Sequence, residues 1–206
     1  MNTDPNSPWS PLSVAEVSHR FDRIDVGWWV AGGRAIDLFL GWETRPHADL
    51  DLEMLRGDRD VLFDVFEGWD LHVVSEGQLV PWHRGDTLDP AVFGVWGRPT
   101  PGSPWSVEVM LADGDATTWR YRRDNEIQRP MGEVVRTSGS GVRYCSPEIQ
   151  LLYKSKRHRP KDDLDMVRCL HRLTADECGW LVWAIARFEP DHPWLSLLEY
   201  AAMGDR

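Results

Sequence analysis

One 26-residue stretch, Trp28 to Glu53, joins three features that restrict how the chain can fold. An apolar run ending at Val30 is followed by a glycine pair, Gly32-Gly33. Two glycines allow a sharp turn, and the N-terminus of a helix that follows such a turn favours an anion such as phosphate. A predicted strand with acidic residues at alternate positions then completes the stretch.

That predicted strand carries two aspartates, Asp49 and Asp51, two residues apart. In an extended strand such residues point to the same side, roughly 7 Å apart along the backbone. Two carboxylates placed in this way can share one divalent cation or hold two. Mg²⁺ suits them, because it takes few carboxylate ligands and completes its shell with water and substrate phosphate. The stretch therefore predicts a phosphate cradle beside an acidic metal site.

Composition narrows the classes of protein that the chain can belong to. The 206 residues are 42% hydrophobic, which predicts one core-forming domain with or without a smaller appendage. A net charge of −10 does not favour a nucleic-acid partner, since such proteins usually carry a basic surface. Three cysteines without a CxxC pair predict neither a disulfide framework nor a structural zinc site. With no signal peptide and no long apolar run, we expect a cytoplasmic protein without membrane contact.

Hydrophobic periodicity and capping signals predict the order of the elements. Helices are expected from Ser13, from the glycine pair to about Leu40, and over 59–67, with strands over 27–31, 49–53, 70–75 and 104–112. This order predicts an α/β (α+β) fold with a mixed sheet flanked by helices. Helix-start signals at Ser146 and Thr174 predict a series of helices from residue 146 to residue 206. We therefore predict an α/β domain over 1–145 and a helical subdomain over 146–206.

The central stretch resembles the nucleotidyltransferase superfamily, and most closely its lincosamide and aminoglycoside branch, which is aminoglycoside-2''-adenylyltransferase-like. In that branch the pattern is an apolar run, then GG-x-A-x-D, a later glycine, and TR-x-H-x-D-hydrophobic-D. The matching residues here are Gly32, Gly33, Ala35, Asp37, Gly41, Thr44, Arg45, His47, Asp49 and Asp51. Arg34 departs from the pattern, because a Trp or another apolar residue is common at that position.

The resemblance implies a third carboxylate on a neighbouring strand, which completes the metal site and can act as general base. Glu108 is the candidate, because it alternates with apolar residues in the predicted strand SVEVML. A solvent-facing strand glutamate is the structural alternative. Asp70, Asp113 and Asp115 are rival candidates for the third acid. The implied catalytic and metal-binding residues are thus Asp49, Asp51 and Glu108.

A second match lies in the C-terminal part, where a helix ending in lysine precedes a basic loop and a Lys-Asp-x-x-Asp pattern. Lys154, Lys161, Asp162 and Asp165 occupy these positions. A lysine near the β- and γ-phosphates would stabilise the leaving pyrophosphate. The alternative is a solvated charged loop in which the two aspartates cap a helix and form ion pairs.

The resemblance also implies a set of nucleotide-binding residues. His47 could contact phosphate, orient an aspartate, or pack within its loop. For Asp37 we expect a structural role, with its carboxylate bonded to the loop over 44–47. The predicted nucleotide-binding residues are Gly32, Gly33, Arg34, Arg45, His47, Lys154 and Lys161.

The resulting hypothesis is a Mg²⁺-dependent nucleotidyltransferase with two metal ions. It would transfer a nucleoside monophosphate, AMP from ATP, to a hydroxyl of a small acceptor, such as an aminoglycoside- or lincosamide-like compound. The excess of acidic residues favours a cationic acceptor. A monomer or homodimer is expected. The alternatives are a catalytically degenerate or antitoxin-like protein that acts by binding a protein partner, and an enzyme that modifies protein or RNA.

Overall fold

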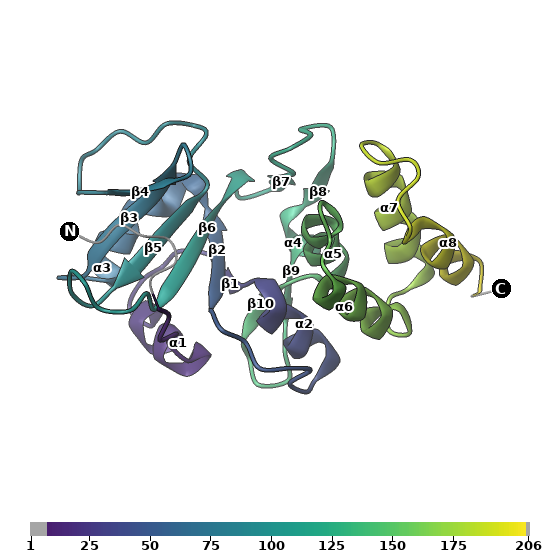
Figure 1. Ribbon diagram of the computed structural model, residues 1–206, viewed down its shortest axis with the longest axis horizontal. Helices are drawn as coiled ribbons and strands as arrows, with labels where there is room; N and C mark the ends of the chain where they lie inside the picture. Colours follow the sequence, from purple (N-terminus) through teal and green to yellow (C-terminus); the bar gives the residue numbers. More distant parts are fainter. Residues whose placement is uncertain (1–7, 205–206) are drawn as a thin grey trace.

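The computed structural model describes residues 8–204 and contains one mixed sheet of ten strands (Figure 1). Eight strands run in the order β4-β3-β5-β6-β2-β1-β10-β9, and β7 joins β6 to β8. The strands are β1 (Trp28–Val30), β2 (Asp51–Leu55), β3 (Asp70–Ser75), β4 (Gln78–Pro81), β5 (Gly94–Arg98), β6 (Val107–Gly114), β7 (Thr118–Arg120), β8 (Gln128–Pro130), β9 (Val135–Thr137) and β10 (Arg143–Cys145). The predicted mixed α/β architecture is confirmed.

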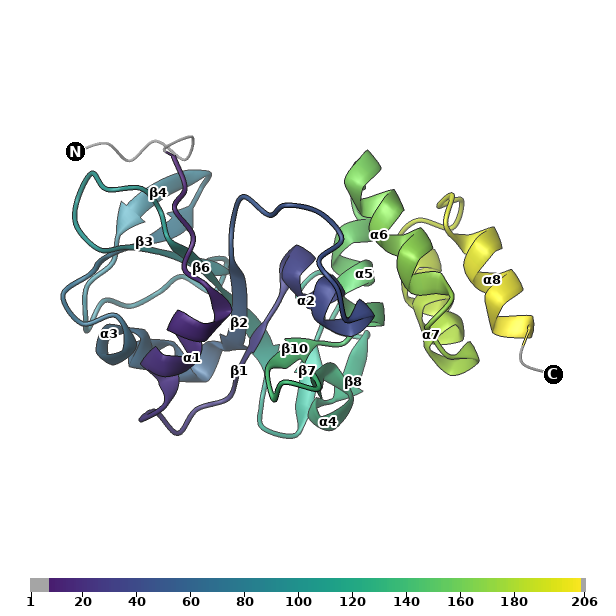
Figure 2. The ribbon, with the colours of Figure 1, turned by 90° about the horizontal axis from the view of Figure 1, so that it is seen from below.

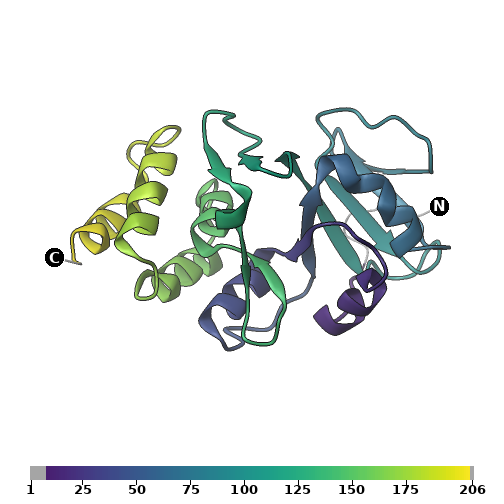
Figure 3. The same ribbon diagram turned by 180° about the vertical axis from the view of Figure 1, so that it is seen from behind.

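Helices surround the sheet and make up the C-terminal part of the chain. They are α1 (Val14–Phe21), α2 (Gly32–Leu40), the 3-10 helix η1 (Arg56–Val61), α3 (Leu62–Val65), α4 (Met131–Val134), α5 (Pro147–Ser155), α6 (Pro160–Leu170), α7 (Ala175–Ala186) and α8 (Leu195–Met203). In the view turned by 90°, α7 and α8 lie at the opposite end of the molecule from β3 and β4 (Figure 2). The view from behind shows the same separation (Figure 3).

The centre of the sheet brings together strands that are far apart in sequence. β2 runs antiparallel to β1 and parallel to β6. The register between β2 and β6 pairs Asp51 with Glu108. Paired residues on neighbouring strands point to the same face, with the strands about 4.8 Å apart. The sheet therefore places two acidic side chains next to each other, although 57 positions separate them in sequence.

Alternation along β2 divides its side chains between two environments. Leu52 and Met54 are fully buried in the hydrophobic core. Glu53 is on the face of Asp51 but is also buried, where its carboxylate accepts hydrogen bonds from Trp29 Nε1 at 2.8 Å and Tyr153 Oη at 3.4 Å. Because Tyr153 belongs to α5, this helix covers the face of β2 that carries Asp51 and Glu53, at the position of Glu53.

Several predicted boundaries hold because their signals are local. Ser13 and Thr174 both form capping boxes at α1 and α7. Gly41 ends α2 with a φ of 83°, the left-handed conformation that glycine adopts readily. None of the helices in the described range 8–204 is long and apolar enough to cross a membrane.

Three local predictions differ from the structure. The helix expected over 59–67 is a 3-10 helix followed by one α-helical turn, so the chain winds more tightly there. Asp49 precedes the strand that was expected to begin with it, because β2 starts at Asp51. The Ser146 hydroxyl does not cap α5, because it donates to the carbonyl oxygen of Glu133 at 2.7 Å.

Candidate active site

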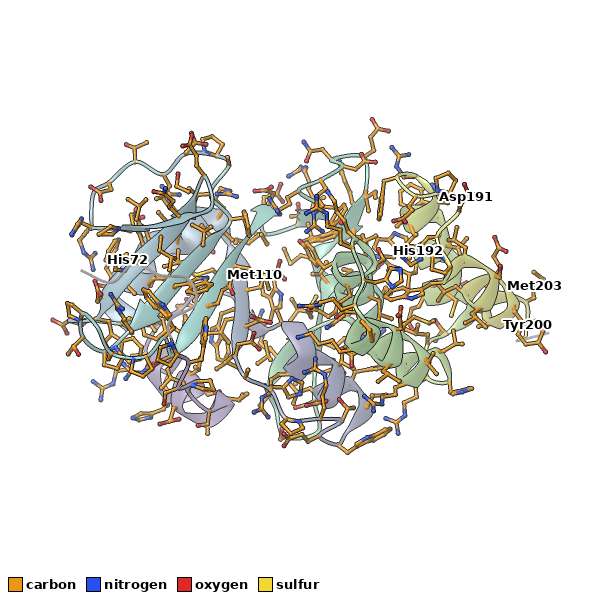
Figure 4. The ribbon with its side chains drawn as sticks, viewed as in Figure 1. His72, Met110, Asp191, His192, Tyr200 and Met203 are labelled. Carbon is orange, nitrogen blue, oxygen red and sulfur yellow. The ribbon has the colours of Figure 1, made fainter. Side chains whose placement is uncertain are left out.

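The predicted acids meet in a cavity of about 430 Å³, which we call the carboxylate cavity. Asp49, Asp51 and Glu108 all line it, together with the glycine pair at the start of α2. Met110 of β6 also lines it, and Figure 4 labels this residue on the strand that carries Glu108. Residues from β2, β6, α2 and the α5–α6 region therefore surround one space.

Burial and a neighbouring acid raise the pKa of two carboxyl groups of this cavity, those of Asp51 and Glu108. Burial, and secondly the charge of Asp49, raises the pKa of Asp51 to about 6. Burial, and secondly the charge of Asp51, raises the pKa of Glu108 to about 7. A carboxylate that loses hydration beside another negative charge binds its proton more tightly. Burial and the neighbouring acids therefore disfavour the charged forms of Asp51 and Glu108.

Gly32 is required by the position of the Asp51 carboxylate. A Cβ atom on residue 32 would overlap the Asp51 side chain, and the φ of Gly32 is +65°. Its N–H donates to Gln150 Oε1 of α5 at 2.8 Å. This N–H is therefore already paired within the protein, and Gly33 is the other α2 residue that lines the cavity.

Gly33 is required by the neighbouring loop. A Cβ atom on residue 33 would lie 2.5 Å from Nδ1 of His47 and 2.6 Å from Nη2 of Arg45. A side chain on residue 33 would therefore displace the side chains of His47 and Arg45. The glycine pair thus lets two segments, the Asp51 strand and the Arg45–His47 loop, approach the start of α2.

A chain of polar contacts runs from α2 through this loop. Asp37 accepts from Thr44 N at 2.9 Å and from His47 Nε2 at 2.6 Å. Arg45 Nη1 lies 3.1 Å from His47 Nδ1. Because guanidinium only donates, Nδ1 must accept and Nε2 must carry the proton that is donated to Asp37. The expected bond between Asp37 and its loop is present, and His47 orients Arg45.

Lys154 is held by two buried aspartates of α6. Its Nζ lies 3.1 Å from Asp162 Oδ1 and 3.0 Å from Asp165 Oδ2. Asp165 also lies 3.5 Å from Arg45 Nη2, so the loop and α5 meet at this carboxylate. Although burial opposes it, hydrogen bonds from Arg159, aided by Lys154, lower the pKa of Asp162 to about 2. Asp162 also caps α6 through Arg159 N at 3.0 Å, so the capping role considered from the sequence is present alongside the ion pair.

The cavity wall carries more basic than acidic side chains. Its acidic residues are Asp49, Asp51, Glu108 and Asp162. Its basic residues are Arg45, Arg123, Lys154, Lys156, Arg157, Arg159 and Lys161. This local excess of positive charge contrasts with the net charge of −10 of the whole chain. The net charge of the whole chain therefore does not predict the charge of the cavity wall.

The structure places two predicted nucleotide-binding residues away from the cavity wall. Arg34 lines a different cavity, where its Nη1 lies 3.9 Å from Glu43. The His47 side chain is 2% exposed and contacts Asp37 and Arg45. Neither residue lines the carboxylate cavity, and their predicted contacts with a nucleotide stay predictions.

The rival acids lie outside the carboxylate cavity. Asp70 accepts from Arg98 Nε at 2.7 Å. Asp113 accepts from Arg56 Nε at 2.8 Å, and Asp115 is bonded within its own turn to Thr117. Of the four acids considered, only Glu108 lines the same cavity as Asp49 and Asp51.

Several lining residues have no counterpart in the sequence prediction. Arg123 lies between β7 and β8, and Gln150 and Tyr153 come from the inner face of α5. No spacing in the sequence marks Arg123, because only the pairing of β7 with β6 brings that loop to the site. For Gln150 and Tyr153 the available signal was their place on the predicted helix of Lys154, with Gln150 one turn before the lysine and Tyr153 directly before it.

The donor chemistry of the cavity fits magnesium. Within residues 8–204, no group of three or more His, Cys, Asp and Glu side chains is placed closely enough to enclose a metal on its own. Mg²⁺, however, does not need such a cage, since it takes few carboxylates and uses water and phosphate oxygens for the rest. Burial, and secondly a neighbouring acid, raises the pKa of both Asp51 and Glu108, and a bound cation would favour their charged forms.

The aminoglycoside-2''-adenylyltransferase family model matches residues 13–81, from α1 to β4. No curated protein matches the sequence at a significant level. The matched segment contains the glycine pair and both aspartates, and it ends before Glu108.

Three solved structures are similar to the chain. The solution structure of the antibiotic-resistance factor ANT(2'')-Ia is 18% identical, covering 91% of this chain and 88% of that chain with a TM-score of 0.49. The crystal structure of ANT(2'')-Ia with adenylyl-2''-tobramycin is 17% identical, covering 92% and 94% with a TM-score of 0.46. Lincomycin-bound LnuA, a lincosamide antibiotic adenylyltransferase, is 14% identical, covering 77% and 97% with a TM-score of 0.52.

The family match and the fold confirm the resemblance predicted from the sequence. At 14% identity, the similarity to LnuA establishes the fold alone, which is nucleotidyltransferase-like. The family match over the segment with the paired aspartates supports the prediction that the chain is a nucleotidyltransferase.

Proposed function

We propose that the protein is a Mg²⁺-dependent nucleotidyltransferase that moves a nucleoside monophosphate, AMP from ATP, to a hydroxyl of a small acceptor. One observation carries this proposal. Asp51 and Glu108 are paired on neighbouring parallel strands, and with Asp49 they line a cavity whose other walls are the start of α2 and a group of basic side chains.

Asp49, Asp51 and Glu108 are the residues that would hold the metal ions. When bound, Mg²⁺ offsets the negative charge on the phosphate oxygens and on the entering and leaving oxygens. The proposed domain division at residue 145 places the carboxylates in the α/β part and Lys154 and Lys161 in the helical part. Substrates would therefore lie between the two parts.

The chain's own residues have separate roles in the proposed reaction. Glu108 accepts the proton of the acceptor hydroxyl, whose oxygen forms a bond to the α-phosphorus. The bond from the α-phosphorus to the oxygen bridging to the β-phosphate breaks, and its electron pair leaves with pyrophosphate. The first turn of α2 and the side chains of Arg45, Lys154 and Lys161 stabilise this leaving group.

A calorimetric titration tests the nucleotide site. ATP, GTP, CTP and UTP are titrated into the wild type and into Asp49→Asn/Asp51→Asn, with and without Mg²⁺. We expect Mg²⁺-dependent binding that the double variant loses by at least about tenfold. Asp113→Asn is the matched control, because Asp113 is a strand aspartate outside the cavity. Equal binding by the wild type and the double variant would contradict the proposal.

Glu108→Gln separates proton transfer from nucleotide binding. The variant keeps the size and one oxygen of the side chain but cannot act as a base. We expect MgATP binding within about threefold of the wild type, and transfer to any acceptor reduced by about 10² or more. Transfer at the wild-type rate would remove Glu108 from the mechanism.

A further inference from the structure

A second cavity of about 480 Å³ adjoins the carboxylate cavity, and we call it the aromatic chamber. The two cavities share Arg123, Lys156 and Arg157 as lining residues. Tyr121, His158, Phe188 and Glu189 line the chamber but not the carboxylate cavity. None of these seven residues has a role in the proposed nucleotide site.

Two aromatic rings form an apolar wall of the chamber. The rings of Tyr121 and Phe188 have centroids 6.4 Å apart and planes inclined by 30°. Tyr121 is fully buried, whereas Phe188 is 38% exposed. Arg123 donates to the Tyr121 hydroxyl at 2.8 Å, so that polar end is already satisfied. An apolar wall with a few polar groups at its edge is the usual composition of a small-molecule pocket.

The three shared basic residues are electrostatically uncompensated. Within residues 8–204, no carboxylate oxygen lies within 4.0 Å of the charged nitrogens of Arg123, Lys156 or Arg157. Lys154, by contrast, contacts two aspartates. Among the described residues that line the chamber, Glu189 is the one with an acidic side chain. The chamber therefore presents positive charge beside its aromatic wall.

The backbone conformation of Arg157, a residue that lines both cavities, is an independent observation. Arg157 has a φ of +57° and directly follows Lys156, the C-cap of α5. Glycine is the usual residue in this left-handed position after a helix, because other residues meet a steric penalty there. The sequence nevertheless has an arginine there, and its side chain lines both cavities.

The place of the chamber indicates which substrate it receives. In nucleotidyl transfer the entering and leaving oxygens are roughly in line across the phosphorus. The proposed pyrophosphate site lies at Gly32, Gly33 and Lys161, which line the carboxylate cavity but not the chamber. In Figure 1, α2 lies below α5, while β7, β8 and the loop after α7 lie above it. The chamber is thus on the side from which the acceptor hydroxyl would enter.

We propose that the aromatic chamber is the acceptor site, and that its acceptor is a flat, largely apolar hydroxyl compound carrying a carboxylate or phosphate. This inference rests on the proposed nucleotidyl transfer, which assigns one side of the site to pyrophosphate and the other to the acceptor. It replaces the cationic acceptor that the net charge suggested. A polycation would face Arg123, Lys156 and Arg157, and like charges placed together oppose binding.

Three phenols of matched shape test the charge preference. 3-(4-Hydroxyphenyl)propanoate, its neutral amide and the cation tyramine are each titrated into wild-type protein saturated with Mg²⁺ and α,β-methylene-ATP, which blocks transfer. We expect the propanoate to bind at least about tenfold more tightly than tyramine, and its affinity to fall as salt is added. Tighter binding of tyramine or tobramycin, or no binding of any phenol, would overturn the proposal.

Chamber variants test the location. Phe188→Ala is expected to weaken propanoate binding about tenfold, Phe188→Leu less than threefold, and Glu189→Gln to strengthen it about twofold. All three should bind α,β-methylene-ATP within about twofold of the wild type. If Phe188→Ala weakens the nucleotide instead, the chamber holds the base and the inference fails. If wild type binds the propanoate but no nucleotide, the proposed function fails while the ligand class of the chamber stands.

Discussion

Gly32 and Asp51 are so close that any side chain on residue 32 would occupy the space of the Asp51 carboxylate. The turn at the start of α2 and the acid on β2 therefore depend on each other. Glycine at this position serves two needs at once, since its φ of +65° is also in the left-handed region.

Gly32→Ala and Gly41→Ala separate these two needs. Both glycines have positive φ, but a Cβ at Gly41 meets no atom within 4 Å. Each variant should lose about 1 kcal/mol of unfolding free energy from its backbone, measured by urea denaturation. Only Gly32→Ala should also lose MgATP binding, by about tenfold or more, because Asp51 must move. Equal nucleotide binding by the two variants would show that the contact has no part in the site.

Arg45 and Arg34 form a second matched pair. Arg45 lines the carboxylate cavity and is held by His47 and Asp165, whereas Arg34 lines another cavity. We expect Arg45→Ala to weaken MgATP binding about tenfold and Arg34→Ala to change it less than twofold, as measured by calorimetry. Stronger loss with Arg34→Ala would place the phosphates on the other side of α2.

His47 is expected to act through Arg45. His47→Ala removes the acceptor for Arg45 and leaves Asp37 without its 2.6 Å partner. An unpaired buried polar group costs about 1–3 kcal/mol, so unfolding free energy should fall by that amount. Since Arg45 is no longer oriented, His47→Ala should weaken nucleotide binding little further in an Arg45→Ala background. Additive losses in this double-mutant cycle would assign His47 a contact of its own.

Lys154 should stabilise the fold as well as the nucleotide. Lys154→Met leaves Asp162 and Asp165 buried without their shared cation, and breaking such a buried group costs about 3 kcal/mol or more. Adding Asp165→Asn removes one of the two buried carboxylate charges that Lys154 contacts. Chemical denaturation should therefore show the double variant to be more stable than Lys154→Met alone. A double variant that is less stable would mean that Asp165 depends chiefly on Arg45.

The stability of the helical part should depend on the protonation of His192, which Figure 4 shows close to α5. His192 Nε2 donates to the Ser155 carbonyl at 3.1 Å, and Nδ1 accepts from Trp194 N at 3.1 Å. Burial lowers the pKa of His192 below its usual 6.5. Since the unfolded chain then binds the proton more readily, the contribution of His192 is complete above pH 6.5 and is lost as pH falls towards the folded pKa.

Unfolding free energies of the wild type and His192→Gln between pH 7.5 and 5 test this dependence. The wild type should lose stability relative to the variant as pH falls, by about 1.4 kcal/mol per pH unit at most. His83→Gln is the control, because the His83 side chain is 77% exposed. Parallel pH profiles for the wild type and His192→Gln would show that His192 is protonated without cost in the fold.

Local sequence signals predicted much of the secondary structure. The Ser13 and Thr174 capping boxes, the left-handed Gly41 and the strand over 70–75 depend on residues within one or two turns of each other. The bond between Asp37 and its loop also spans only ten positions. Such features are visible in the sequence because both partners lie in the same segment.

The sequence by itself determined the class of fold, the glycine pair and the candidate acids. Only the tertiary structure decided which acids meet, because the pairing of Asp51 with Glu108 depends on the register of two strands separated by a long crossover. Only the structure brought Arg123 to the cavity and turned Arg34 away from it. It also concentrated basic residues at the site of an acidic chain, because charge at a cavity depends on which side chains converge there and not on their sum.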